Sequence, residues 1–225
     1  MQEVSSELAK GALMIDLRRP AEHATAHVRG SLSIPAGSSF GTWLGWVVPD
    51  PERPLVLLLE SDADWDDAIR QGLRIGYESV VGYLHGGFDA WAESGGATET
   101  LGAIDVATLA ARLSGDSGSV PTVVDVRQAY EYEAGHVPGS LSIGAGDLPD
   151  RLDDLPRNRP IATICASGYR ASVGASLLRA AGFASVAWVS GGVPTWRAAG
   201  YPVEYGQLGN IAEGEGGDRT AVNVR

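Results

Sequence analysis

One cysteine and the arginine five residues after it are the residues of this sequence best suited to covalent chemistry. Cys165 follows a short apolar run, 161–164, that predicts a buried strand, and residues 171–181 have helical spacing. The cysteine is therefore predicted at a strand-to-helix turn. The loop that starts there contains a glycine able to adopt a positive φ, so successive backbone N–H groups can point at the sulfur; it reads Cys165-Ala166-Ser167-Gly168-Tyr169-Arg170.

This predicted loop has a positive electrostatic field. The N-terminal end of the following helix carries partial positive charge, and the guanidinium of Arg170 adds to it. Both favour a thiolate, the nucleophilic form of cysteine. The simplest alternative is a structural cysteine, because free cysteines are among the most buried residue types. The position of Cys165 before a glycine-containing loop and a helix favours the reactive cysteine.

The sequence contains one pattern twice. Residues 15–18 and 27–34 recur as residues 124–127 and 136–143, with Asp16 matching Asp125 at an offset of 109. A repeat of about 105 residues has the size of a domain and exceeds a solenoid unit. We predict two domains, 1–100 and 101–205, packed closely because the linker at 95–100 is short, followed by a flexible Gly-rich acidic tail at 206–225.

Short apolar strands alternate with helices in each copy. In the second copy, Asp105 is predicted to cap a helix that ends at Leu113. Strands are expected at 122–126, 141–143, 161–164 and 186–189, and helices at 128–134, 170–181 and 193–199. The pattern predicts the α/β class, with each domain a mainly parallel sheet covered by helices on both faces. Ligands bind such sheets beyond the carboxyl ends of the strands, where Cys165 is expected.

The first copy differs at the equivalent loop, Leu59-Glu60-Ser61-Asp62-Ala63-Asp64. Leucine replaces the nucleophile, and aspartates replace the glycine and the arginine, so we predict that this copy is inactive. The spacing of Asp62, Asp64 and Asp66 superficially resembles a calcium loop, but Asp67 and Leu73 stand where such a loop needs glycine and glutamate. A solvated acidic loop is favoured, and no metal site is predicted.

Composition limits the classes of function. With 17 Lys and Arg against 28 Asp and Glu, the net charge of −11 argues against a nucleic-acid partner. No long apolar run or signal peptide is apparent, so we expect a cytoplasmic protein without a membrane segment. A single cysteine excludes a Cys-x-x-Cys pair, and the four histidines lack metal-ligand spacing. We therefore expect no metal and no other cofactor.

Taken in order, the second-copy motifs resemble a rhodanese domain. They are Asp125-Val126-Arg127, Glu131, Gly135-His136-Val137-Pro138-Gly139-Ser140, the Cys165 loop, Ser190-Gly191-Gly192 and Trp196. The resemblance covers nearly all of 1–205 and is to a tandem rhodanese with an inactive first and an active second copy. Residues 37–46 also resemble the paired rhodanese modules fused to metallo-β-lactamase-like persulfide dioxygenases. This implies a possible partner protein or fused dioxygenase-like domain.

The resemblance implies a thiosulfate sulfurtransferase. Cys165 would take sulfur from thiosulfate or a persulfide donor and pass it to a small acceptor such as cyanide or a thiol. It implies substrate contacts from Ala166, Ser167, Gly168, Tyr169, Arg170 and Arg127, and structural support from Asp125, Glu131 and His136.

Several of these residues have a structural alternative. Arg170 either neutralises donor anions or locks the loop by pairing with Asp125 or Glu131, and the pairing role is favoured. Asp125 is expected to hydrogen-bond backbone or arginine. His136 is interpreted as a turn and packing residue, because a thiolate activated by the loop needs no base. Trp188 and Trp196 are expected in the core.

Two other functions compete with sulfur transfer. A cysteine phosphatase needs Cys-x5-Arg, whereas Cys165 and Arg170 are spaced Cys-x4-Arg, which leaves a smaller cradle. An arsenate reductase would need a second cysteine. A non-catalytic rhodanese-fold binding or regulatory module is the remaining alternative, and Leu59 supports it for the first copy.

Overall fold

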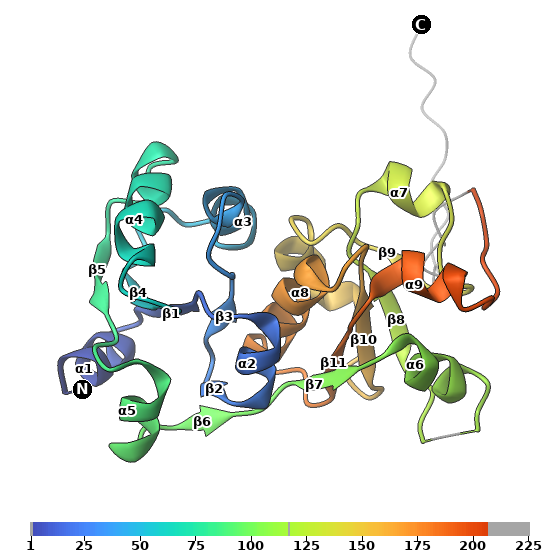
Figure 1. The fold of residues 1–225 in the computed structure, drawn as a ribbon, viewed down its shortest axis with the longest axis horizontal. Helices are drawn as coiled ribbons and strands as arrows, with labels where there is room; N and C mark the ends of the chain where they lie inside the picture. The colour runs from blue at the N-terminus through green and yellow to red at the C-terminus, as the bar shows by residue number, and fades with distance from the viewer. Residues whose placement is uncertain (1, 117, 207–225) are drawn as a thin grey trace, which may run out of the picture.

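The structure is a computed structural model that describes residues 2–116 and 118–206, and it contains two α/β domains side by side (Figure 1). The predicted fold class is confirmed, since each domain is built on a parallel sheet with helices packed around it. The predicted tail falls outside the described residues from position 207 onward. Within the described residues, no helix has the length and apolar character needed to cross a membrane.

The sheet of the first domain has the strand order β3-β1-β4-β5, and all its pairs are parallel. Its strands are β1 (Leu13–Asp16), β3 (Leu32–Ser33), β4 (Leu55–Leu58) and β5 (Val80–Tyr83). The helices are α1 (Gln2–Ala9), α2 (Pro20–Thr25), α3 (Phe40–Val47), α4 (Asp64–Arg74) and α5 (Gly87–Glu93). Outside the sheet, β2 (His27–Val28) pairs antiparallel with β6 (Thr98–Glu99), which lies near the end of the first domain in the sequence.

The sheet of the second domain has the order β7-β11-β10-β8-β9, again with parallel pairs. Its strands are β7 (Gly102–Ile104), β8 (Thr122–Asp125), β9 (Leu141–Ser142), β10 (Ile161–Ile164) and β11 (Val186–Val189). The helices are α6 (Val106–Leu113), α7 (Ala129–Glu133), α8 (Tyr169–Ala180) and α9 (Gly192–Ala198), with a 3-10 helix η1 (Leu148–Asp154). The central strand β10 ends next to Cys165.

Most predicted elements of this domain match within one or two residues. Asp105 caps α6 by accepting a hydrogen bond from the N–H of Thr108 at 2.7 Å, and β10 and β11 have the predicted bounds. Helix α8 begins at Tyr169, one residue before the predicted start. Two elements lacked a sequence signal: η1, and the edge strand β7, whose three residues pair with β11.

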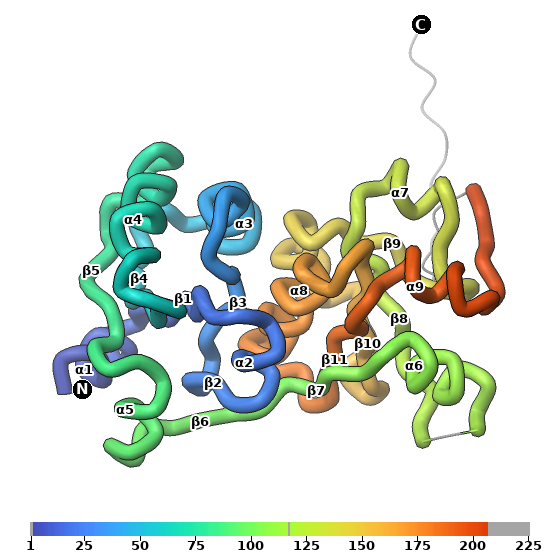
Figure 2. Tube along the Cα trace, viewed as in Figure 1, coloured from blue at the N-terminus to red at the C-terminus, as the bar shows by residue number. Residues whose placement is uncertain are grey.

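The two domains share a continuous apolar core. Helix α8 of the second domain packs against β3 of the first, and the two elements lie next to each other in Figure 2. One core cluster runs from Ile15 and Trp43 in the first domain to Val173 and Leu177 in the second. The backbone N–H of Ser33 in the first domain also donates a hydrogen bond to Oγ of Ser176 in α8. Burial of this shared surface holds the domains together.

A pair of stacked aromatic rings occupies equivalent positions in the two copies. In the first domain, His23 stacks on His27 with ring centroids 3.9 Å apart, and in the second, Tyr132 stacks on His136 at 3.6 Å. His23 is fully buried, and burial lowers its pKa well below the ordinary value of 6.5, with further lowering by the charges of His27 and Arg18. The folded first domain therefore contains a neutral histidine where the second domain has a tyrosine.

The depressed pKa of His23 predicts acid sensitivity. Its contribution to stability is complete above the unfolded value of 6.5 and is lost as the pH falls toward the folded pKa, by up to about 1.4 kcal/mol per pH unit. We expect His23→Tyr, which copies Tyr132, to reduce the difference between urea unfolding at pH 7.5 and pH 5.5. An unchanged pH dependence in this variant would contradict the assignment to His23.

Candidate active site

Cys165 lies at the carboxyl end of β10, between the ends of β8 and β11. Ile161 to Ile164 are buried, so the strand is fixed by apolar contacts on both faces. The backbone N–H of Val193, at the start of α9, donates to the carbonyl of Cys165 at 2.8 Å. Cys165 itself has 0% exposed surface. The strand and α9 thus fix the backbone from which the sulfur projects.

Gly168 brings a backbone donor to the sulfur. Its φ of 104° lies in the left-handed region that favours glycine, and its N–H donates to Sγ of Cys165 at 3.1 Å. Among the described loop residues, this is the amide that reaches the sulfur, whereas the sequence predicted several. A Cβ at this position would lie 2.8 Å from Cζ3 of Trp188, so a side chain here would clash. Backbone conformation and packing both require glycine.

Arg170 pairs with Glu131 across the site. Both guanidinium nitrogens Nη1 and Nη2 donate to the carboxylate, with Nη2 to Oε1 at 2.8 Å. The hydrogen bond with Glu131 raises the pKa of Arg170, and the charges of Glu131, Cys165 and Asp125 add to this effect. Glu131 is held in turn by the N–H of Gln128 in the capping box of α7. Of the two pairings expected from the sequence, the structure contains the one with Glu131.

Arg127 is committed to a second buried pair. Its Nη2 donates to Oδ2 of Asp125 at 2.6 Å and to the carbonyl of Gly135 at 2.9 Å. Its Nε also donates to Asp125, and the backbone N–H of Arg127 donates to the same carboxylate. The expected pairing of Asp125 with backbone and arginine is present. Both guanidinium groups beside the loop are therefore neutralised by carboxylates.

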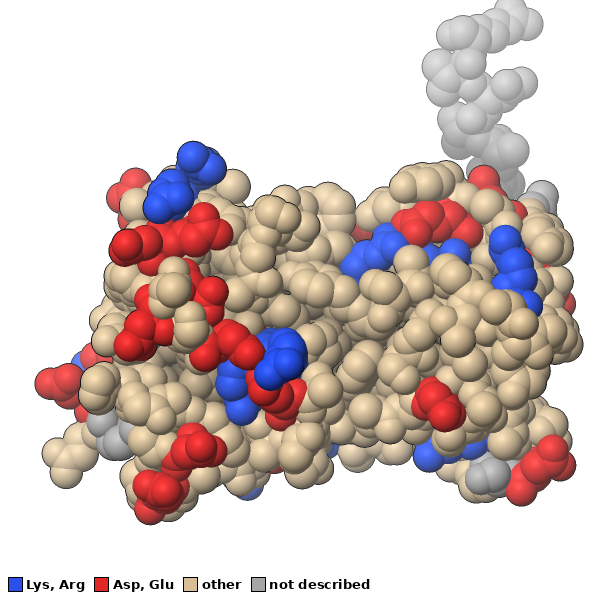
Figure 3. All heavy atoms as spheres, in the orientation of Figure 1, with Lys and Arg blue, Asp and Glu red and all other residues tan. Residues whose placement is uncertain are grey.

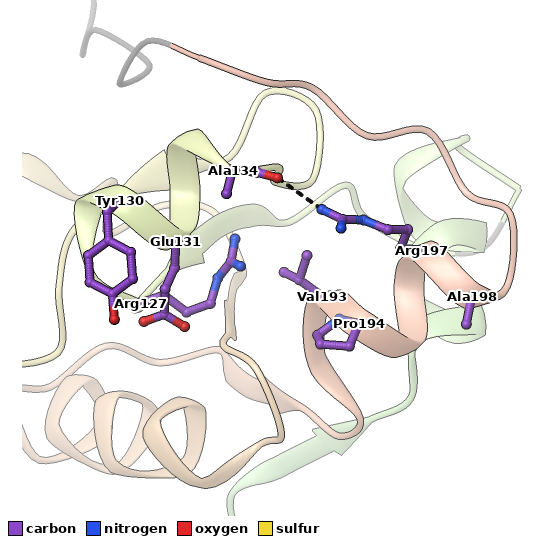
Figure 4. A pocket seen from close by; sticks show the side chains of 8 residues that line it. All are labelled: Arg127, Tyr130, Glu131, Ala134, Val193, Pro194, Arg197 and Ala198. Carbon is purple, nitrogen blue, oxygen red and sulfur yellow. Dashed lines mark hydrogen bonds between the residues drawn. The ribbon is translucent and has the colours of Figure 1, made fainter.

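A cavity of about 490 Å³ lies between α7 and α9 (Figure 4). Tyr130 and Glu131 form one side, and Val193, Pro194 and Arg197 form the other, with Arg197 donating to the carbonyl of Ala134. The cavity adjoins the loop, because the N–H of Val193 donates a hydrogen bond to the carbonyl of Cys165 and Glu131 accepts one from Arg170. The sequence predicted Arg127 as a substrate contact and Glu131 as a supporting residue, and both line this cavity. It missed Val193, Pro194 and Arg197 of α9, which lie between and beside the motif residues Gly192 and Trp196.

His136 and Tyr169 are both occupied by structural contacts. Nδ1 of His136 lies 2.9 Å from the carbonyl of Tyr132, and the ring is buried in the stack with that tyrosine. The hydroxyl of Tyr169 donates to the carbonyl of Pro35 in the first domain at 3.1 Å, and its ring lies against Trp43. Sequence reasoning placed Tyr169 at the substrate. In the structure its hydroxyl points across the domain interface.

Ala166 and Ser167 form the outer part of the loop, with Ala166 half-buried and Ser167 exposed. Trp188 and Trp196 are buried as expected. In the first domain, Leu59 packs into the core, and Asp64 accepts the N–H of Ser61 at 2.8 Å. Asp64, which stands at the position of Arg170, is therefore used in a local hydrogen bond at the start of α4. Within the described residues, no three metal-binding side chains gather at one point.

The family model for the rhodanese-like domain matches residues 1–94 and 105–199. The chain belongs to the rhodanese-like domain family. Both copies are covered, including the copy with Leu59. The boundaries predicted at 100 and 101 fall between the two matched segments.

Curated relatives match single stretches of this chain. The HTH-type transcriptional regulator Rv0324 of Mycobacterium tuberculosis is 40% identical over 93 residues, which are 40% of this chain and 40% of the regulator. A sulfurtransferase of Allochromatium vinosum is 30% identical over 44% of this chain and 92% of its own length. The thiosulfate sulfurtransferase GlpE of Pseudomonas savastanoi is 32% identical over 36% of this chain and 76% of its own. The chain thus spans less than half of the first of these relatives.

Among solved structures, a thiosulfate sulfurtransferase from Pseudomonas aeruginosa aligns with 91% of this chain and 42% of its own, at 22% identity and a TM-score of 0.44. A rhodanese-related protein from Thermoplasma volcanium is 30% identical over 46% of this chain and 97% of its own, with a TM-score of 0.42.

The pair of Glu131 and Arg170 predicts a pH-dependent contribution to stability. The hydrogen bond from Arg170 lowers the pKa of Glu131 below its ordinary 4.5, so the contribution is present above that value and is lost as the pH falls through the folded pKa. We expect Glu131→Gln to destabilise the protein by about 1 to 2 kcal/mol at pH 7, and the difference should shrink as the pH falls below 4.5 and through the lowered pKa of Glu131.

The control is Glu22→Gln, the equivalent position in the first copy. Glu22 pairs with Arg19, whose side chain is 75% exposed, and its loss should cost less than about 0.5 kcal/mol. Equal losses in the two variants, measured by urea unfolding, would show that the Glu131 pair has no special weight.

Proposed function

We propose that this protein is a sulfurtransferase that moves a sulfane sulfur through a persulfide on Cys165. The observation that carries the proposal is the N–H of Gly168 on Sγ of Cys165, at the start of the 12-residue helix α8. A backbone donor and a helix N-terminus stabilise a sulfur anion without a titrating group. Membership in the family and the sulfurtransferases among the relatives support the same conclusion.

Two displacement steps complete the cycle. The Cys165 thiolate attacks the outer sulfur of thiosulfate, the bond between the two donor sulfurs breaks, and its electron pair leaves with sulfite. A negatively charged persulfide remains on Cys165. Cyanide or a thiolate then attacks the outer sulfur, and the electron pair of the broken bond returns to Cys165. With a persulfide donor, a thiolate leaves in place of sulfite, so neither route needs an added oxidant.

Charge around the site favours recognition by backbone groups. Arg127 and Arg170 are both paired with carboxylates, and acidic side chains gather on the face of the first domain formed by α4 and α5 (Figure 3). Because Cys165 has no exposed surface, a donor reaches the sulfur only when loop side chains move. We infer that donor and acceptor are small molecules, or an extended thiol of a partner protein, entering from the cavity beside α7 and α9.

A mass measurement tests the persulfide directly, since Cys165 is the only cysteine of the sequence. Brief exposure of the reduced protein to thiosulfate should add about 32 Da, the mass of one sulfur atom. The gain should disappear on addition of cyanide and should be absent from Cys165→Ser. No gain with thiosulfate, a polysulfide or glutathione persulfide would overturn the proposal and favour a binding module.

The first domain is proposed to be non-catalytic, and a transplanted nucleophile tests this. Cys165→Ala combined with Leu59→Cys should show no thiosulfate turnover, because carboxylates surround the loop at position 59 and disfavour a thiolate. Leu59 is also only 9% exposed and packs in the core. Cyanide-dependent thiocyanate formation above the level of Cys165→Ala alone would contradict the prediction.

A further inference from the structure

We propose that the inactive first domain positions the catalytic loop of the second domain, with Tyr169 as the positioning residue that links them. The proposal rests on the proposed role of Cys165 as the sulfur carrier. It gives the domain that lacks a nucleophile a defined part in the reaction, and it assigns to Tyr169 a role different from the substrate contact expected from the sequence.

Tyr169 is the residue that directly follows the sulfur's hydrogen-bond donor. Its hydroxyl donates to the carbonyl of Pro35 in the first domain at 3.1 Å. Its ring is partly buried and lies 6.1 Å from the ring of Trp43, between centroids. Burial raises the pKa of Tyr169 to about 12, so the hydroxyl stays protonated and remains a donor at neutral pH. One peptide bond joins Tyr169 to Gly168, so the anchored side chain restrains the backbone directly next to the Gly168 N–H.

A second hydrogen bond fixes the helix behind the loop. The backbone N–H of Ser33, two residues before Pro35, donates to Oγ of Ser176 at 2.9 Å. The segment 33–35 of the first domain therefore contacts α8 both at its first residue and near its middle. Helix α8 also packs along β3, as the ribbon in Figure 1 shows. These contacts place α8 relative to the first domain along its length.

The opposite side of the loop is closed by the second domain itself. Trp188 lies against Gly168 so closely that a Cβ there would sit 2.8 Å from its ring. The hydroxyl of Thr163 donates to the carbonyl of Ala171 at 2.8 Å, which holds the first turn of α8 to β10. Gly168 is thus fixed between a core tryptophan and a tyrosine anchored in the other domain. Its N–H reaches the sulfur at 3.1 Å because both sides are held.

The variant Tyr169→Phe keeps the ring and removes the hydroxyl. We expect the rate of persulfide formation at saturating thiosulfate to fall about fivefold, the factor that corresponds to one neutral hydrogen bond, while KM changes by less than about twofold. The split between rate and KM separates positioning from donor binding. Ser176→Ala, which removes the second contact and leaves the loop unchanged, should lower the rate in the same direction by about twofold.

The matched control is Tyr77→Phe. Tyr77 is also a buried tyrosine whose hydroxyl donates to a backbone carbonyl, that of Val48, but the bond lies within the first domain. Both tyrosine variants should lose similar thermal stability, and Tyr77→Phe should keep the wild-type rate. Equal rates in Tyr169→Phe and Tyr77→Phe would overturn the positioning role.

The outcome is separable from that of the proposed function. If the wild-type protein gained no sulfur, the sulfurtransferase proposal would fail, and the rate of alkylation of Cys165 by iodoacetamide at pH 7 would then test the positioning. Slower alkylation in Tyr169→Phe than in Tyr77→Phe is expected, since weakening the Gly168 contact disfavours the thiolate. Indistinguishable alkylation rates would overturn it.

Discussion

The hydrogen bond from the Gly168 N–H to Sγ of Cys165 is the interaction on which the rest of the site depends. It requires a glycine with positive φ, and it requires that the strand before it and the helix after it be immobile. The strand is held by two parallel neighbours and an apolar core on both faces. The helix is held by β10 and by the first domain. A short loop with one donor is thereby held in place by elements of both domains.

The pairing of charges around this loop defines what kind of field the sulfur experiences. Two arginines stand close by, yet each is matched by a carboxylate, so neither adds a net charge to the immediate surroundings. What remains is directional: a backbone N–H and the N-terminus of α8 aimed at one atom. Such groups stabilise a single sulfur anion and suit a persulfide, whose charge lies near the same point. A tetrahedral dianion such as phosphate would need several free donors spread over a wider loop. The short Cys-x4-Arg spacing does not provide such a loop.

Helices and strands that are determined by neighbouring residues could be predicted from the sequence. Residues 161–164 and 186–189 are apolar runs flanked by residues that interrupt regular structure. Asp105 is a capping residue before an amphipathic segment. The local sequence pattern was therefore enough to predict these elements. The duplication fixed the number of domains for the same reason. The contact of Tyr169 with Pro35 could not be predicted, because it depends on how two domains are oriented. The choice of Glu131 over Asp125 as partner of Arg170 likewise depended on the direction of α7, which no pattern encodes.

One buried arginine–aspartate pair is common to both copies of the domain. The copy without a nucleophile has the same Asp-x-Arg arrangement, in which Arg18 pairs with Asp16 and donates to the carbonyl of Ala26 at 2.9 Å, as Arg127 does to Gly135. This pair is present in both copies and holds the turn after the strand in each.

The pair of Arg170 with Glu131 has no such counterpart, because Asp64 stands at the arginine position and Glu22 pairs locally with Arg19. The same holds for the glycine donor, which is replaced by Asp62 in the first copy. These two features of the second copy lie in the loop that starts at Cys165, and part of the contacts that hold this loop come from the first copy. The first domain thus has the same scaffold without a cysteine at position 59, and two of its backbone groups, in Ser33 and Pro35, hydrogen-bond the helix that follows Cys165.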